Sequence, residues 1–169
     1  NAEGRTFQGC LYFGLMLTPK GPKVIEYNCR FGDTEPQVVL PRLETDIMDI
    51  FDAINAGTLA QLDIRWSDKA CACVILASGG YPKSYTKGLE ITGLTDGQRA
   101  GVTVLHAGTA LLEVKLVSVG GRVLGSTAVG DNLQAALDTA YAAAREVHFD
   151  GVQYRKDIGA RALAAGKCE

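Results

Sequence analysis

Residues 24–35 read VIEYNCRFGDTE, and this stretch decides the fold predicted for the rest of the chain. It begins as an apolar strand and becomes polar at alternate positions. Because side chains alternate between the two faces of a strand, we expect Glu26, Asn28 and Arg30 to share one face. The opposite face is expected to be packed, and it carries Ile25, Tyr27, Cys29 and Phe31.

The polar face combines a carboxylate, an amide oxygen and a guanidinium. Glu26 and Asn28 offer hard oxygen ligands for Mg²⁺, which takes one or two protein ligands and completes its shell with phosphate and water. Arg30 adds a cationic fork that suits a phosphate or a carboxylate. The same pattern also fits a solvated strand face that merely mixes Glu and Arg, so the pattern alone leaves both interpretations open.

Residues 24–43, VIEYNCRFGDTEPQVVLPRL, closely resemble the metal-binding strand of the glycinamide ribonucleotide synthetases, a family of the ATP-grasp superfamily. The E-x-N-x-R core is shared with biotin carboxylase and related ligases, whereas the extension RFGDTEPQ is much narrower. The family usually reads RFGDPE, and Thr34 stands here where proline is usual. This difference affects the stiffness of the turn more than its chemistry, because proline mainly pre-sets φ.

Four further motifs resemble the C-terminal domain of the same family and occur in the family's order. They are SGGYPKSYTKGLEITGL (78–94), LHAGTA (105–110), GGRVLGSTAVG (120–130) and FDGVQYRKDIGARAL (149–163). The resemblance therefore extends from about Thr6 to Leu163, and four ordered motifs are more specific than a single glycine-rich loop.

The resemblance implies a ligase that joins glycine to 5-phosphoribosylamine with ATP, through a glycyl phosphate, in purine biosynthesis. It implies Mg²⁺ (or Mn²⁺) at Glu26 and Asn28, with Arg30 also contacting the ATP phosphates. Arg30, Gly32 and Asp33 would contact the substrates, with Arg30 and Asp33 as the catalytic residues. Arg30 would stabilise the transferred phosphoryl group, and Asp33 suits an ammonium group.

We expect an α+β fold in two domains, at residues 1–60 and 61–169. The first is the C-terminal part of an ATP-grasp lobe, with a β-hairpin and helices, and the second is a small antiparallel β/α domain. In the first domain, residues 10–18 predict a strand buried on both faces that pairs with the strand from Val24. Helices are expected from Thr34, limited by Pro41, and from the cap at Thr45–Asp46 to Gly57.

In the second domain, strands are expected at residues 69–77 and 102–106. Residues 114–119 and 122–129 predict a hairpin across Gly120–Gly121, a favoured two-residue turn. Asp131 is expected to cap a helix whose apolar face carries Leu133, Leu137, Ala140, Ala144 and Val147. Residues 149–159 close this domain, and residues 160–169 form a tail.

The amino-acid composition limits the classes of binding partner and the cellular compartment that we expect for this chain. The chain has 169 residues, 47% of them hydrophobic and 21% charged, and a net charge of −2, so no bulk attraction to nucleic acid or to an anionic membrane is expected. No apolar run is long enough to span a bilayer. Five cysteines without framework spacing predict reduced thiols in the cytoplasm.

In this family the nucleotide-holding lysines, loop and hinge precede the metal strand, and only 25 residues precede Glu26 here. We therefore expect the N-terminal half of the enzyme to act as a partner in cis or in trans, and this chain alone to be inactive. The alternatives are a non-catalytic binding or assembly module and another ATP-grasp enzyme of the carboxylase type.

Three other features carry weaker functional signals. Cys71 and Cys73 share one strand face, but no second Cys/His pair lies nearby to complete a zinc site, so we interpret them as packing residues. His106 precedes Ala-Gly-Thr at a strand end and is either structural or close to the active site. The loop at 78–88 is either a phosphate-binding loop or a plain surface loop.

Overall fold

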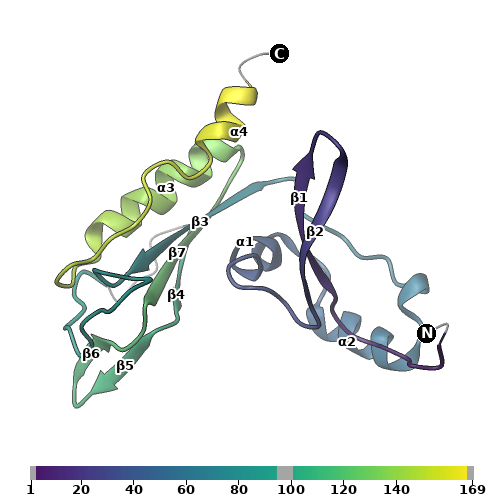
Figure 1. Cartoon of the computed structure of the whole chain (residues 1–169), viewed down its shortest axis with the longest axis horizontal. Helices are drawn as coiled ribbons and strands as arrows, with labels where there is room; N and C mark the ends of the chain where they lie inside the picture. Colours follow the sequence, from purple (N-terminus) through teal and green to yellow (C-terminus); the bar gives the residue numbers. More distant parts are fainter. Residues whose placement is uncertain (1–2, 95–100, 167–169) are drawn as a thin grey trace. The chain divides into compact units, whose positions relative to one another are not determined.

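The computed structural model describes residues 3–94 and 101–166, and the chain forms two compact units. The units comprise Asn1–Ser67 and Asp68–Glu169, so they divide beyond the boundary that we predicted at residue 60. Each unit combines short helices with antiparallel strands, which confirms the α+β class (Figure 1). Among the described residues, no helix has the length and apolar character needed to cross a membrane.

The first unit contains the predicted hairpin. Strand β1 (Tyr12–Thr18) pairs antiparallel with β2 (Gly21–Asn28), and the register shifts between Gly14 and Leu15, where β2 carries a bulge. The turn needs only two residues, Pro19 and Lys20, and is shorter than predicted.

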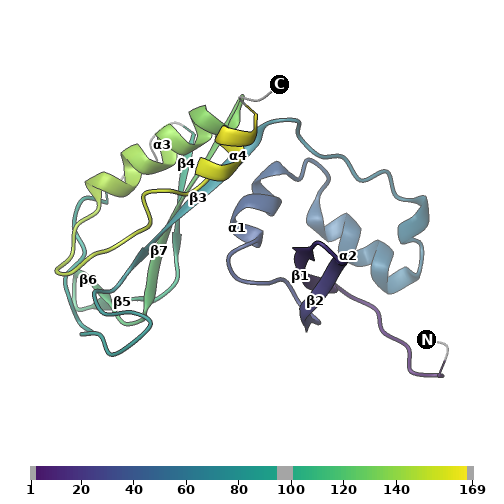
Figure 2. The same ribbon diagram turned by 45° about the horizontal axis from the view of Figure 1, so that its top comes forward.

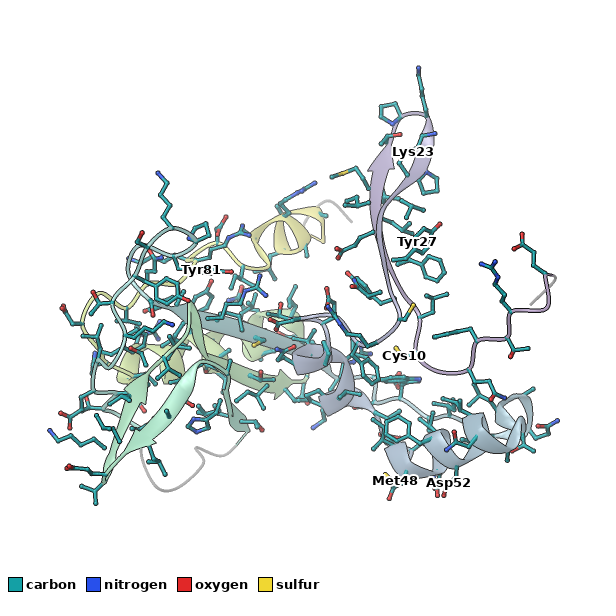
Figure 3. The ribbon with its side chains drawn as sticks, turned by 60° about the horizontal axis from the view of Figure 1, so that its bottom comes forward. Cys10, Lys23, Tyr27, Met48, Asp52 and Tyr81 are labelled. Carbon is teal, nitrogen blue, oxygen red and sulfur yellow. The ribbon has the colours of Figure 1, made fainter. Side chains whose placement is uncertain are left out.

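Two predictions are wrong for this unit: that the strand at residues 10–18 is buried on both faces, and that Ile25, Tyr27, Cys29 and Phe31 form a packed face. Leu17, Ile25 and Tyr27 are 83%, 64% and 62% exposed, and Cys29 is exposed as well. Tyr27 projects away from the hairpin (Figure 3), and its ring makes an edge contact with Phe13, 5.1 Å between centroids. An apolar run predicts that a strand is buried, but a hairpin of two strands cannot bury both of its own faces.

Two short helices follow β2. Helix α1 (Pro36–Val39) continues directly into the 3-10 turn η1 (Leu40–Arg42), and Pro41 limits the helix as predicted. Helix α2 (Ile47–Ala56) begins at Asp46, whose side chain accepts a hydrogen bond from the Met48 backbone, and ends at Gly57 in the left-handed conformation. Both ends of α2 confirm the prediction.

The apolar face of α2 lines a pocket of about 580 Å³ within the first unit, together with residues such as Phe31, Leu40 and Trp66. Met48 and Asp52 project from the other side of the helix (Figure 3). The chain returns over this region through the 3-10 turn η2 (Leu59–Gln61), and Trp66 forms a bridge with Leu43. These contacts explain why the first unit extends to Ser67.

The second unit is built on a three-stranded antiparallel sheet in the order β3 (Ala70–Ala77), β7 (Arg122–Gly130) and β4 (Val102–His106). Helix α3 (Leu133–Glu146) covers one face of this sheet (Figure 2). Its N-terminal cap is Asn132, whose side chain accepts from the Ala135 backbone, and not the predicted Asp131.

The core of the second unit lies between the sheet and α3. Central strand β7 contributes Val123, Leu124 and Ala128, each at most 1% exposed, and the helix contributes small alanines that let it approach closely. The buried hydroxyl of Ser126 donates to the Ala140 carbonyl oxygen at 2.9 Å and so joins strand to helix. This face of α3 confirms the predicted helical spacing.

The hairpin predicted across Gly120–Gly121 is wrong. Instead β5 (Thr109–Leu112) pairs with β6 (Lys115–Ser118) across Glu113 and Val114, while β7 pairs with β3 and β4. The backbone N–H groups of Val119 and Gly120 donate to the Gly108 oxygen, which diverts the chain from a tight hairpin.

After α3, residues 149–159 close the second unit as an irregular segment, and α4 (Ala160–Ala165) forms most of the predicted tail. The last residues of that tail, including the fifth cysteine at position 168, lie outside the described residues.

Candidate functional site

The predicted metal row lies on one face of the hairpin in the first unit. Glu26 is opposite Gly14 and Asn28 is opposite Tyr12, so the four residues share a face. The Glu26 side chain lies over Gly14, where an added Cβ would come within 2.8 Å of Glu26 Cγ. Within the described chain, no hydrogen bond or ion pair engages the side chain of Glu26 or Asn28.

Arg30 does not extend this row by strand parity, contrary to the prediction. Strand β2 ends at Asn28, and Cys29 and Arg30 form a bend. The guanidinium of Arg30 donates from Nη1 to the Phe31 carbonyl oxygen at 2.6 Å and is exposed. The position of Arg30 is therefore determined by the turn that follows the strand.

The same turn carries Gly32 and Asp33. Gln37, on α1, donates from Nε2 to Asp33 Oδ1 at 2.9 Å, which links this exposed carboxylate to the helix. The backbone N–H groups of Val38 and Val39 both donate to the Glu35 carbonyl oxygen. Residues 33–39 therefore form one hydrogen-bonded segment.

Two residues that the sequence patterns did not indicate also belong to this region, Tyr12 and Glu35. Hydrogen bonding to Glu35, followed by desolvation and the charges of Glu35 and Glu26, raises the pKa of Tyr12. Glu35 Oε2 is buried and hydrogen bonds to none of the described residues. No sequence pattern indicated either residue, because the place of Tyr12 beside the row depends on the cross-strand register.

The residues present fit a divalent cation of the magnesium type. Glu26 and Asn28 supply one carboxylate and one amide oxygen on one face, without internal partners among the described residues. No group of three or more His, Cys, Asp or Glu residues gathers as a metal site in the described ranges. Mg²⁺ does not need such a cluster, because it retains waters and binds substrate phosphates.

The motifs of the second unit form a network of their own at one end of its sheet. Ser78 Oγ donates to the Gly120 oxygen at 2.8 Å, and Gln153 Nε2 donates to the oxygens of Ser78 and Tyr81, at 3.1 Å each. His106 Nδ1 lies 3.1 Å from Thr109 Oγ1. The hydrogen bonds among Ser78, Gly120 and Gln153 show that these motifs hold one another in place. A functional role for the motifs stays a hypothesis.

Cys71 and Cys73 lie on strand β3 as reduced thiols, each partly buried. They alternate with buried Ala72 and Val74, so they lie on the face of the sheet opposite α3. The backbone of His148 exchanges two hydrogen bonds with the backbone of Thr92.

Comparison with protein families assigns both parts of the chain. Residues 71–161 match the model described as phosphoribosylglycinamide synthetase, C domain, and residues 1–36 match the ATP-grasp (A) domain of the same synthetase. The C-domain match alone covers more than half of the chain.

Curated relatives show the same likeness over nearly the whole chain. It is 49% identical over 158 residues to a phosphoribosylamine–glycine ligase of Caldanaerobacter subterraneus, which covers 94% of this chain and 37% of that protein. It is also 50% identical over 163 residues to the trifunctional purine biosynthetic protein adenosine-3 of Gallus gallus, covering 96% of this chain and 16% of that protein. The chain thus spans well under half the length of these relatives.

A solved structure agrees with the sequence comparisons. The phosphoribosylamine–glycine ligase of Thermotoga maritima matches with a TM-score of 0.75 and 34% identity, covering 92% of this chain and 38% of that one. Two family models, relatives at about half identity and a shared fold lead to one conclusion: the chain belongs to the phosphoribosylglycinamide synthetase family.

Proposed function

We propose that this chain is the C-terminal part of an ATP-dependent ligase that joins glycine to 5-phosphoribosylamine and forms glycinamide ribonucleotide. The observation that carries the proposal is the row on β2. Glu26 and Asn28 share one face of a strand opposite Gly14, and no described residue pairs with their side chains. Carboxylate and amide oxygens left open in this way suit a magnesium–nucleotide complex.

The proposed reaction has two steps. A glycine carboxylate oxygen attacks the γ-phosphorus of ATP, the bond to the ADP oxygen breaks, and glycyl phosphate forms. The amine of phosphoribosylamine then attacks the acyl carbon, phosphate leaves, and the nitrogen gives up a proton. Mg²⁺ or Mn²⁺, when bound, neutralises charge on the phosphates.

The chain's own residues would bind and orient. Glu26 and Asn28 hold the metal face, and Arg30 places a fixed cation beside the transferred phosphoryl group. Gly32 would contact the substrates through its backbone, and Asp33 would accept from the substrate ammonium group. No side-chain nucleophile is needed, because phosphoryl transfer depends on position and charge.

The remaining wall of the site would come from further ligase polypeptide, in cis or in trans. The exposed apolar hairpin supports this, because Phe13, Leu15 and Leu17 lie on one face of β1 and are 47%, 53% and 83% exposed. Such a face is stable when another layer packs on it. Reduced cysteines fit a cytoplasmic enzyme, and nothing in the charge of the chain favours nucleic acid or membrane partners.

A chimaeric ligase tests the proposal. This chain replaces the matching segment of the Caldanaerobacter ligase, and formation of ADP is followed with and without glycine and phosphoribosylamine. We expect turnover that requires both substrates and ATP. A folded chimaera that binds nucleotide without turning over would favour the non-catalytic module instead, and turnover with bicarbonate in place of glycine would favour a carboxylase-type enzyme.

A further inference from the structure

The pocket lined by the apolar face of α2, called the α2 pocket below, lies entirely within the first unit, and its wall is mainly apolar. Folded interiors are close-packed, and they contain few voids larger than one water molecule, whose share of liquid volume is about 30 Å³. A hollow of about 580 Å³ is therefore far larger than a packing defect.

Large apolar side chains at the α2 pocket are left unburied. Phe51 and Trp66 are both exposed, and within α2, all of which the structure describes, Ala53 alone is buried. The helix also carries Asp49 and Asp52, so it has the amphipathic pattern of a helix that packs one face against a further layer. The uncovered wall therefore has the character of a docking surface.

The family comparisons point to what covers this wall. Residues 1–36 match the ATP-grasp (A) domain of the synthetase, and Cys10 and Phe31 in this range line the pocket. The Caldanaerobacter ligase contains much more polypeptide, because the chain covers only 37% of its length. Apolar side chains of that further polypeptide are complementary to the wall of the pocket.

Phe31 connects the α2 pocket to the proposed site. It lines the pocket, and its carbonyl oxygen accepts a hydrogen bond from Arg30 Nη1 at 2.6 Å. A group that fills the pocket contacts Phe31 and restricts the movement of the residue that holds the guanidinium.

We propose that the α2 pocket is the docking surface for apolar side chains of the further ligase polypeptide, and that Phe31 is a positioning residue that couples this docking to Arg30. This inference rests on the proposed function. The pocket is a separate surface from the exposed β1–β2 hairpin, because no residue of β1 or β2 lines it.

Hydrogen exchange tests the docking without a catalytic readout. Peptide 47–56, which covers α2, is compared in the 169-residue chain and in the chimaeric ligase. We expect exchange to be at least about 10-fold slower in the chimaera, because a covered helix opens less often. Ile54→Asp, which places a charge in the pocket, should abolish this difference, whereas Met48→Asp, on the other side of the helix, should retain it (Figure 3). Equal exchange in the unsubstituted chain and chimaera overturns the proposal.

The dye anilinonaphthalene sulfonate tests the other possible occupants. We expect the chain to bind the dye in the pocket and the chimaera to bind it at least about 10-fold more weakly, because the pocket is filled. Equal affinity in both would assign the pocket to a small apolar ligand and overturn the proposal. Protection of peptide 47–56 that rises with the concentration of the chain alone would assign it to a second copy, with the same consequence.

Kinetics of the chimaera test the coupling through Phe31. We expect Phe31→Ala to lower kcat by about 10-fold to 100-fold, the size of effect that a displaced catalytic group produces. Phe31→Leu keeps an apolar side chain in the pocket and should retain most of the activity. Equal losses in the two variants would overturn the positioning role.

A double-mutant cycle separates positioning from general damage. In a Phe31→Ala background, Arg30→Lys should lower kcat by no more than about twofold, because the guanidinium is already displaced. Independent, additive losses would refute the coupling. An unsubstituted chimaera that folds without activity would instead count against the proposed function, and the exchange experiment would still decide on the docking.

Discussion

At the scale of single residues, Glu26 is the proposed metal ligand with the clearest geometry. Its carboxylate lies over Gly14 on an open strand face and pairs with no described residue. We expect Glu26→Gln in the chimaeric ligase to lower turnover by about 100-fold or more, because an amide is a poorer ligand than a carboxylate for a hard cation. Circular dichroism should be unchanged. Wild-type turnover at limiting Mg²⁺ would contradict the metal assignment.

A substitution at Arg30 can separate the effect of the planar guanidinium from the effect of its positive charge. The guanidinium lies in the bend after β2 and already donates to the Phe31 oxygen at 2.6 Å. Arg30→Lys keeps the charge but loses the planar fork, so we expect kcat to fall by about 10-fold to 100-fold. Steady-state kinetics of the chimaera measure this change. Unchanged kinetics would remove Arg30 from the handling of phosphate.

At the scale of elements, the beginning of α2 is a capped helix end. Asp46 Oδ1 accepts from the Met48 backbone N–H at 2.8 Å. We expect Asp46→Ala to destabilise the first unit by about 1 kcal/mol, because one orphan donor of the helix loses its partner. Asp52→Ala, on the same helix but beyond its first turn, is the control. Urea unfolding followed by Trp66 fluorescence reports on this unit, and equal losses in both variants would contradict a capping role.

A second prediction at this scale concerns the two cysteines of strand β3. Cys71 and Cys73 lie partly buried on the sheet face opposite α3, and the described ranges contain no further ligands that complete a metal site. We expect Cys71→Ala and Cys73→Ala to lower stability by about 0.5–1 kcal/mol each and to leave metal content unchanged. Stoichiometric zinc by elemental analysis, lost in either variant, would overturn this assignment.

At the scale of the whole molecule, the prediction concerns the 169-residue chain by itself. It supplies the proposed metal ligands Glu26 and Asn28, Arg30 and the turn after β2, but it spans only 37% of the length of the Caldanaerobacter ligase. We expect no steady turnover and no tight binding of Mg–ATP, because ion pairs in open water contribute only about 0–1 kcal/mol each. Calorimetry and an ADP assay measure both properties. Tight binding or turnover by the chain alone would contradict the proposal.

The exposed hairpin also predicts association. Leu17 and Ile25 are largely exposed on an apolar strand pair, and such faces tend to self-associate. Sedimentation should show a concentration-dependent increase in mass that Leu17→Asp reduces.

The sequence alone determined most of the local structure and the chemistry of the row. The hairpin, the cap and end of α2, the apolar face of α3 and the Glu26–Asn28 pair all follow from patterns over fewer than about fifteen residues, where backbone sterics and side-chain periodicity dominate. The ordered motifs also indicated the family, because their identity and order along the chain are properties of the sequence itself.

Only the tertiary structure decided three other points. Gly120–Gly121 has the composition of a hairpin turn, but contacts with Gly108 and Ser78 direct β7 into the centre of the sheet. Strand parity ended at Asn28, because β2 stops there and residues 29–30 form a bend. Glu35 raises the pKa of Tyr12, although the two residues lie far apart in the sequence. Non-local contacts of this kind depend on register and packing, which no local window of sequence encodes.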